Sequence, residues 1–164
     1  MSAGTLVSLE EYLNTSYDPD VEYVDGVLVE RNLGDWLHSL AQKNIIVALS
    51  RKYPRIYAMP ELRSRTTATR YRLPDVGVLL APPQTRYLLD AAFVAIEILS
   101  EDDRMSHVLE KLEEYAAHGT PHIWLIDPRL RQTFTFRDNC LAEVETLETS
   151  DPRLELTRDE IFAA

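Results

Sequence analysis

The chain has one cysteine, five glycines and no hydrophobic run long enough to cross a membrane. Cys140 has no partner for an internal disulfide, which is typical of a reducing compartment, so we expect a cytoplasmic protein. The apolar segment from Ala91 to Leu99 is shorter than a membrane span, and Glu97 interrupts it. The first residues, Met1 to Glu11, have neither a basic start nor a long apolar stretch, so we expect no signal peptide.

Several common catalytic and binding motifs are absent as well. The few glycines form no phosphate-binding loop, and no serine elbow supports triad chemistry. The histidines other than His38 show no zinc-ligand spacing, and a lone cysteine cannot form a thiolate site. The sequence also has no helix-turn-helix and no zinc finger. Any target specificity therefore has no recognisable module to carry it.

Positive charge is scarce, because 17 lysines and arginines stand against 27 acidic residues and the net charge is −10. This balance argues against a general nucleic-acid binder, which attracts phosphate with a basic surface. The charge is uneven: residues 138–160 contain eight acids and two arginines, whereas residues 51–72 contain seven basic residues and one acid, Glu61. This basic band, residues 51–72, has two interpretations, an anion-binding surface or merely solvated charge.

The length of 164 residues and the hydrophobic content of 45% are sufficient for one core, so we expect a single domain over residues 1–164. Ser8 predicts the start of a short helix, and Asp35 the start of a long amphipathic helix to about Lys52. The buried stripe of the long helix is expected to consist of Leu37, Leu40, Ala41, Ile45, Ala48 and Leu49. Asp25-Gly26 predicts a hairpin between residues 21–24 and 27–31. A second amphipathic helix begins at Met105 and ends before Gly119, and its apolar stripe consists of Met105, Val108, Leu109, Leu112, Tyr115 and Ala116.

The remaining pattern predicts a mixed sheet. Strands are expected at residues 56–59, 76–80, 92–99 and 122–126, with a polar ribbon at 62–72, an outer hairpin at 133–136 and 141–145, and a short helix at 156–162. Residues 76–80 and 92–99 are apolar enough to be central strands covered on both faces. The order from residue 35 is αβββαβ, and a helix joining two strands indicates a parallel crossover. We therefore expect an α/β fold with helices on a mixed sheet.

Glu97 is the most informative residue, because it lies within the apolar segment from Phe93 to Leu99. An ionised carboxylate there is costly unless it is paired or binds a metal. Asp75 follows Pro74 and opens the neighbouring apolar strand, and two such carboxylates can share a hard cation such as Mg²⁺. The alternatives are a structural salt bridge or a sheet-edge position for Glu97, and a simple turn for Asp75.

Lys111 lies beside the buried stripe of the helix that follows the Glu97 strand. From that position its amine can hold an attacking water or stabilise charge on a phosphate, although a boundary lysine more commonly covers apolar surface with its stem. Glu22, in the first hairpin strand, and His38, in the first turn of the long helix, can face the same cleft. Spacing alone favours surface or core-edge positions for both.

Taken in this order, the residues resemble the PD-(D/E)XK nuclease superfamily, and in particular its small stand-alone branch of restriction-endonuclease-like proteins, the Uma-two type. The resemblance extends over nearly the whole chain. Its landmarks are residues 22–26, His38, residues 72–76, Glu97 to Ser100, residues 111–115 with Gly119, and Trp124 to Pro128. It implies a restriction-endonuclease-like fold and metal-dependent endonuclease activity on nucleic acid, with DNA as the expected substrate.

One position departs from the superfamily pattern, in which the lysine stands two residues after the second acid. That position here is Leu99, so the resemblance implies that the lysine has moved to the following helix, at Lys111. The resemblance further implies Mg²⁺ as the cofactor, with Mn²⁺ as a substitute. The implied metal ligands are Asp75, Glu97 and Glu22, and the implied catalytic residues add Lys111 and His38.

Two other functions use the same residues. One is an inactive interaction module that keeps the nuclease fold, since a fold does not fix a function. The other is a metal-dependent phosphoesterase acting on small nucleotides, which tolerates an acidic surface better. The superfamily often works in pairs, so a homodimer is expected, with the outer hairpin near Phe134, Phe136 and Leu141 either pairing with a second copy or packing on its own domain.

Overall fold

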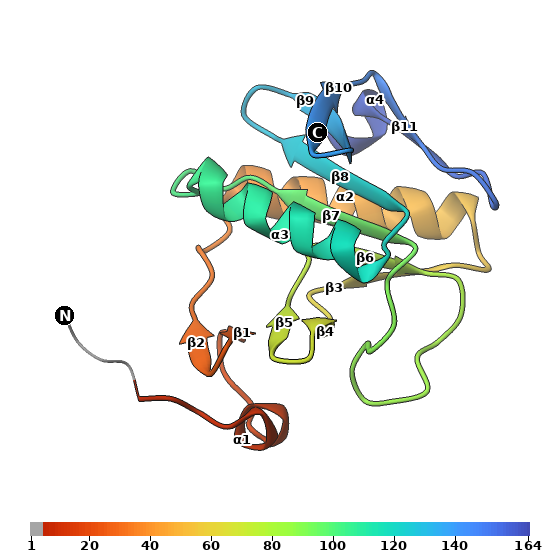
Figure 1. Ribbon diagram of the computed structural model, residues 1–164. Coiled ribbons are helices and arrows are strands. Elements are labelled where there is room, and N and C mark those ends of the chain that lie inside the picture. The colour runs from red at the N-terminus through yellow and green to blue at the C-terminus, as the bar shows by residue number, and fades with distance from the viewer. Residues whose placement is uncertain (1–4) are drawn as a thin grey trace.

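A six-stranded mixed sheet forms the centre of the structure, a computed structural model that describes residues 5–164 (Figure 1). Residues 1–4, the start of the segment expected not to be a signal peptide, lie outside the described residues. The helices are α1 (Leu9–Asn14), α2 (Trp36–Lys52), α3 (Met105–His118) and α4 (Arg158–Ile161). The strands are β1 (Glu22–Val24), β2 (Val27–Val29), β3 (Tyr57–Pro60), β4 (Ser64–Thr67), β5 (Arg70–Arg72), β6 (Val76–Leu79), β7 (Val94–Ile98), β8 (His122–Asp127), β9 (Gln132–Arg137), β10 (Cys140–Glu143), β11 (Thr146–Glu148) and β12 (Glu155–Thr157).

The main sheet has the strand order β10-β9-β8-β7-β6-β3. Strands β7 and β8 are parallel and are joined by α3, whereas every other neighbouring pair is antiparallel. The predicted order αβββαβ is confirmed as α2, β3, β6, β7, α3 and β8. The mixed sheet and the parallel crossover follow from this order, because a parallel connection needs a long crossover element.

A second sheet, of order β2-β1-β5-β4, combines the N-terminal hairpin with the polar ribbon. The hairpin turns at Asp25 and Gly26, whose φ angles of 51° and 92° lie in the left-handed region that such a turn requires. Tyr23 of β1 pairs with Tyr71 of β5, so the ribbon leaves the main sheet to join the hairpin. The hairpin was predicted, but its pairing with the ribbon was not.

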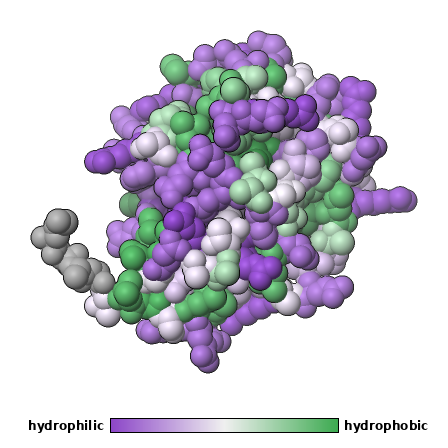
Figure 2. All heavy atoms as spheres, viewed as in Figure 1, coloured by the Kyte–Doolittle hydropathy of each residue, from purple (hydrophilic) through white to green (hydrophobic). Residues whose placement is uncertain are grey.

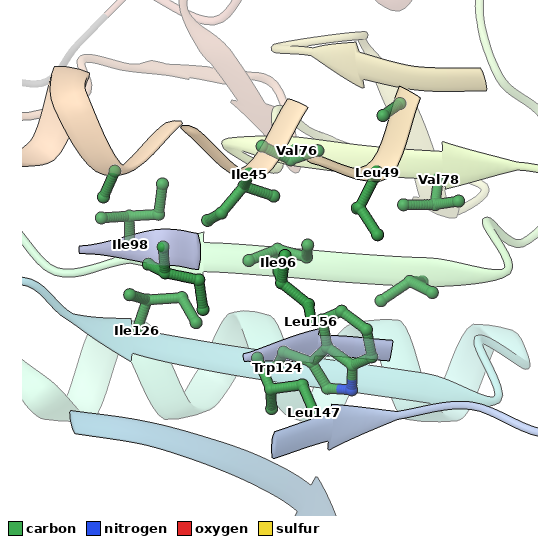
Figure 3. Packing of buried hydrophobic residues seen from close by; sticks show 14 of the residues in the cluster. Ile45, Leu49, Val76, Val78, Ile96, Ile98, Trp124, Ile126, Leu147 and Leu156 are labelled. Atoms are coloured by element: carbon green, nitrogen blue, oxygen red, sulfur yellow. The ribbon is translucent and has the colours of Figure 1, made fainter. Parts of the chain in front are cut away.

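Helix α2 covers one face of the main sheet through a single buried stripe. Ala41, Ile45 and Leu49 pack on the residues of β6 and β7, and Figure 3 shows Ile45 and Leu49 facing Val76 and Val78. Trp124 of β8 extends the same cluster toward β11 and β12. Leu37 was predicted in this stripe but is 41% exposed.

Helix α3 covers the opposite face of the sheet (Figure 1), where Val108, Leu112 and Tyr115 are buried. It ends at Gly119, which has the left-handed φ of 107° expected of a glycine cap. Phe134, Phe136 and Leu141 of the outer hairpin join this same cluster. Packing on its own domain therefore accounts for the apolar residues of that hairpin.

The C-terminal segment differs from its prediction. Residues 156 and 157 belong to β12 rather than to a helix, and α4 is only Arg158–Ile161. Thr157 caps α4, with its side chain accepting from the Glu160 backbone and the Glu160 side chain accepting in return. Leu156 lies in β12 and pairs with Leu147 of β11, and both leucines are buried in the core.

Arg63 ties the N-terminal segment to the second sheet. Its guanidinium is 5% exposed, donates twice to Asp20, at 2.8 and 2.5 Å, and donates to the carbonyls of Tyr12 and Thr15. Arg63→Met removes these four hydrogen bonds and leaves the Asp20 carboxylate without its counter-charge, so we expect the free energy of unfolding to fall by about 3 kcal/mol in urea denaturation. Arg153→Met, at an exposed arginine, is the matched control, and an equal effect of both substitutions would contradict the role given to Arg63.

The surface agrees with the acidic composition. Figure 2 shows hydrophilic residues over most of the visible face, with hydrophobic residues gathered in separate patches. Across residues 5–164, no helix combines the length and the apolar character needed to cross a bilayer.

Candidate active site

A cleft of about 290 Å³ opens where the N-terminal hairpin, the first turn of α2, the ends of β6 and β7, and α3 meet. Polar and charged side chains make up most of its wall. It is lined by all five residues predicted for the site: Glu22, His38, Asp75, Glu97 and Lys111. The structure therefore brings together residues that are up to 89 positions apart in the sequence.

The sheet register places the two central acids side by side. Val76 of β6 pairs with Ile96 of β7 in an antiparallel arrangement. Continuing that register by one residue sets Asp75 opposite Glu97. Residues in directly opposed positions have Cβ atoms about 5 Å apart, which is close enough for two carboxylates to share one cation.

The Asp75 carboxylate is buried and fully contacted. Its Oδ2 accepts from the Ile98 backbone at 2.7 Å, and its Oδ1 accepts from Arg31 Nη2 at 2.7 Å and lies 3.2 Å from His38 Nε2. Burial raises the pKa of Asp75, but His38, Arg31 and the Ile98 N–H outweigh it and lower the pKa below its usual value. Asp75 is therefore an anion at neutral pH.

Glu97 contacts Tyr115 and Lys111 of α3, so it points to the α3 face of the sheet, and it is 6% exposed. Its Oε1 accepts from the Tyr115 hydroxyl at 2.5 Å, and its Oε2 lies 3.7 Å from Lys111 Nζ. Burial is the largest cause that raises the pKa of Glu97 to about 7, and the charges of Asp75 and Glu22 add to it, against the opposing effect of Lys111. A cation beside Glu97 would relieve this surplus of negative charge.

Lys111 connects two of the acids from the middle of α3. Its Nζ lies 3.0 Å from Glu22 Oε1 as well as 3.7 Å from Glu97 Oε2. Burial lowers the pKa of Lys111, but the charges of Glu97 and Glu22 outweigh it and raise the pKa above its usual value. The amine is therefore protonated at neutral pH, so it can donate to a water or a phosphate but cannot accept a proton.

Glu22 is the least exposed of the three acids, at 1%. Its Oε2 accepts from Arg72 at 3.0 Å, and its Oε1 accepts from the Leu73 backbone at 3.2 Å and faces Lys111. Arg72 in turn makes a two-point contact with Glu114 of α3, at 2.9 and 2.6 Å. This network fixes α3 against β1 and β5, which sets the position of Lys111 in the cleft.

His38 lies at the N-terminal end of α2, which begins after the Asp35 cap. Burial lowers the pKa of His38, but its contact with Asp75 outweighs this and raises it. The loop before the helix passes close to the imidazole, since a Cβ at Gly34 would lie 2.9 Å from Nδ1. His38 therefore reaches the site as a partner of Asp75.

Three residues of the cleft region were not predicted as site residues. Arg31 was included only as the last residue of the predicted hairpin strand 27–31, and Arg72 only in the basic band and in one landmark. Tyr115 was assigned to the apolar stripe of its helix. Its position four residues after Lys111, on the same side of α3, is the one signal that could have connected its hydroxyl to the site.

Much of the basic band is neutralised within the protein. Four of its seven basic residues form ion pairs: Lys52 with Glu160, Arg63 with Asp20, Arg70 with Asp25, and Arg72 with Glu22. The band is therefore not a continuous free cationic surface, and these four residues favour the interpretation in which the charge has no external partner.

The donor set suits a cation that needs few protein ligands. Among residues 5–164, no three histidine, cysteine, aspartate or glutamate side chains converge as a ready coordination shell. Asp75 and Glu97 remain, as two opposed carboxylates in a cleft. Mg²⁺ commonly binds through one or two carboxylates and completes its shell with waters and substrate phosphate, so these residues fit it. Glu22 fits least, because it lies on β1 of the second sheet rather than opposite Asp75 or Glu97, and Arg72 and Lys111 already neutralise it.

Comparison with known proteins agrees with this architecture. Residues 9–163 match the Uma2 family, described as "Putative restriction endonuclease". The crystal structure of a "putative nuclease belonging to DUF820" from Anabaena variabilis ATCC 29413 is similar, with a TM-score of 0.78, 24% identity, and coverage of 96% of this chain and 98% of that one. No curated protein sequence matches the chain.

The class of protein follows from the fold and the family match. The mixed sheet and its flanking helices are those of a PD-(D/E)XK restriction-endonuclease-like protein, as predicted. The match over residues 9–163 is more specific, and the chain belongs to the Uma2 family of restriction-endonuclease-like proteins.

Proposed function

We propose that the protein is a metal-dependent endonuclease that hydrolyses phosphodiester bonds in DNA, with Mg²⁺ as its cofactor and Mn²⁺ as a substitute. One observation carries the proposal: two buried carboxylates, Asp75 and Glu97, oppose each other in a cleft, and the protonated amine of Lys111 lies 3.7 Å from Glu97. Family membership supports nuclease chemistry, and most of the chain takes part in that match.

Each residue has a separate task in the proposed reaction. Asp75 and Glu97 would hold the divalent cation, which would supply Lewis acidity toward the scissile phosphate and lower the pKa of the attacking water. His38 and Tyr115 orient the two carboxylates through their contacts with them. Lys111 donates from its ammonium to the attacking water or to the phosphate oxygen on which charge develops. Arg72 positions α3 and thereby Lys111, through Glu114 and Glu22.

Nicking of supercoiled plasmid tests the function itself. Purified protein with Mg²⁺ or Mn²⁺ should convert supercoiled DNA to open-circular and linear forms, and a chelator should stop the conversion. A matched RNA substrate separates a deoxyribonuclease from a ribonuclease. A well-folded protein that cuts neither polymer with either cation would contradict the proposal and favour the inactive interaction module.

The ion-paired basic band favours one second candidate, a phosphoesterase acting on small nucleotides. A polymer gains much of its affinity from many phosphate contacts, and four of the band's basic residues are already paired. A small substrate needs only the cleft of about 290 Å³. Turnover of bis(p-nitrophenyl) phosphate or a cyclic nucleotide without cleavage of plasmid or RNA would establish this candidate instead.

The affinity for a metal should depend on pH because of Glu97. Its pKa is raised to about 7, so protons compete with the cation below that pH, and ionisation above it favours binding. We expect the Mn²⁺ affinity measured by calorimetry to fall about tenfold per pH unit below 7 and to level off above it. The dependence should persist in His38→Gln, which removes a neighbouring group that titrates nearby. An affinity that is flat between pH 6 and 8 would contradict the raised pKa.

We further propose that residues 1–164 act as one domain, in the cytoplasm and as a homodimer. The lone and exposed Cys140 supports a reducing compartment. The edge strands β3 and β10 are the elements through which two sheets could pair. Sedimentation equilibrium gives the molecular mass directly, and a mass of one chain at micromolar concentration would contradict the dimer.

A further inference from the structure

Arg31 is a cleft residue whose hydrogen bonds are incomplete. Its Nη2 donates to Asp75 Oδ1 at 2.7 Å, and its Nη1 lies 3.3 Å from Glu61 Oε1. Its Nε is buried and has no hydrogen-bond partner within the described part of the chain. A buried donor without an acceptor is costly, so a residue kept in this state calls for an explanation.

Other arginines of the protein show how an arginine side chain binds when its carboxylate partner is part of the protein. Arg63, Arg70 and Arg72 each direct Nε and Nη2 together at one carboxylate, that of Asp20, Asp25 and Glu114 respectively. In Arg31 the same edge is only half used, because Nη2 contacts Asp75 and Nε contacts nothing. That edge is the pair of parallel donors that binds a carboxylate or a phosphate at two points.

The contact with Asp75 also coincides with a position that a cation would take. The Oδ2 atom of Asp75 is held by the Ile98 backbone at 2.7 Å, whereas Oδ1 receives Arg31 and His38. A divalent ion on Oδ1 would compete with the Arg31 guanidinium for the same lone pairs and would repel its charge. Binding of the metal and the contact of Arg31 with Asp75 therefore oppose each other.

We propose that Arg31 is a phosphate-binding residue that exchanges partners, leaving Asp75 when a divalent cation binds and directing its Nε and Nη2 to a phosphate of the substrate. This inference rests on the proposed function and adds to it the residue that recognises the phosphate. It also explains the unused Nε, whose acceptor is then an oxygen of the substrate. The exchange couples the two ligands, because substrate draws Arg31 away from the oxygen that the metal needs.

Two measurements on Arg31→Met and Arg31→Lys test the exchange. The first is calorimetric titration of Mn²⁺ without nucleic acid, where we expect Arg31→Met to bind about tenfold more tightly than wild type and Arg31→Lys to remain near wild type. The second is fluorescence anisotropy of a labelled DNA oligonucleotide in Ca²⁺, which takes the same oxygen ligands with longer bonds. Here both variants should bind about tenfold more weakly, because neither keeps the two-point donor.

Arg153→Met is the matched control, since Arg153 also lies between two acids, Glu148 and Glu155, but far from the cleft. It should change neither measurement. Effects of opposite sign in Arg31→Met, tighter for metal and weaker for DNA, support the exchange, because a merely structural role would weaken both. Unchanged or weaker Mn²⁺ binding by Arg31→Met, or unchanged DNA binding by either variant, overturns it while the proposed function stands.

Failure of the Arg31 exchange can be distinguished from failure of the proposed function. Wild-type protein that binds no Mn²⁺ contradicts the metal site itself and the exchange with it. If Arg31→Met fails to fold, Arg31→Lys decides the question, because it keeps the charge and alters only the geometry of the donors. Near-wild-type Mn²⁺ affinity with weakened DNA binding then supports the proposal, and undiminished DNA binding overturns it.

Discussion

Glu97→Gln should reduce metal-dependent cleavage by at least about a hundredfold without loss of stability. Glutamine keeps the shape of the side chain, and its carbonyl can still accept from the Tyr115 hydroxyl. It removes one negative charge from a buried group that includes Asp75 and Glu22, whose charges add to the larger effect of burial in raising the pKa of Glu97 to about 7. The melting temperature should therefore equal or exceed that of the wild type, which is the signature of a residue retained for function.

The measurement pairs an initial rate of plasmid nicking with a thermal unfolding curve for the same preparation. Glu113→Gln is the matched control, because Glu113 is an exposed acid of α3 and its loss should alter neither quantity. If Glu97→Gln nicked plasmid at the wild-type rate, Glu97 would not be part of the active site. A large fall in melting temperature would instead make Glu97 a structural ion-pair residue, the alternative that the sequence left open.

Lys111→Met should have a comparable effect on cleavage together with a loss of stability. The substitution keeps the apolar stem but leaves the buried carboxylates of Glu22 and Glu97 without the amine that lies 3.0 and 3.7 Å away. We expect the free energy of unfolding to fall by about 2 kcal/mol in urea, and nicking to fall by about a hundredfold or more. If Lys111 only covered apolar surface, methionine would preserve both.

A double-substitution cycle separates the two effects of Lys111→Met. Adding Glu97→Gln removes one of the uncompensated charges, so the double variant should regain part of the lost stability while remaining inactive. Leu99→Lys in the Lys111→Met background tests the relocation of the amine. Leu99 lies two residues after Glu97 and packs toward α3, so a lysine there faces the same side. We expect this double variant to recover part of the nicking activity. No recovery would show that the amine must be supplied from α3.

Those helices and turns that a local sequence signal determines could be predicted from the sequence. Asp25-Gly26 requires a left-handed turn, Gly119 ends α3 in the left-handed region, and Asp35 caps α2 through its side chain. The final helix was overextended at Leu156, because a strand that leads directly into a capped helix has the same apolar spacing at its junction. The pairing of β1 with β5 depends on a long-range register, for which no local signal exists.

The acids and the lysine of the site were predicted for a different reason. Glu97 and Asp75 stand out because charge is rare in apolar strands, and the resemblance identified Lys111, Glu22 and His38. Arg31 was missed because a surface arginine and a cleft arginine look alike in sequence. The ion pairs that Arg70 and Arg72 form were likewise not predictable from the sequence, because these pairs join distant segments of the chain. Their acidic partners are Asp25, Glu22 and Glu114. Charge density in the sequence therefore overstated the free positive surface.

Crystals grown with MnCl₂ provide the most direct test of the central claim, that Asp75 and Glu97 share one cation. We expect an anomalous-scattering peak about 2.1 Å from a carboxylate oxygen of each residue, lost in Glu97→Gln crystals grown alongside. We also expect no second pair of protein carboxylates to hold the ion as strongly. Millimolar Mn²⁺ with no peak between these two residues, or a peak at a site that excludes both, would contradict the claim.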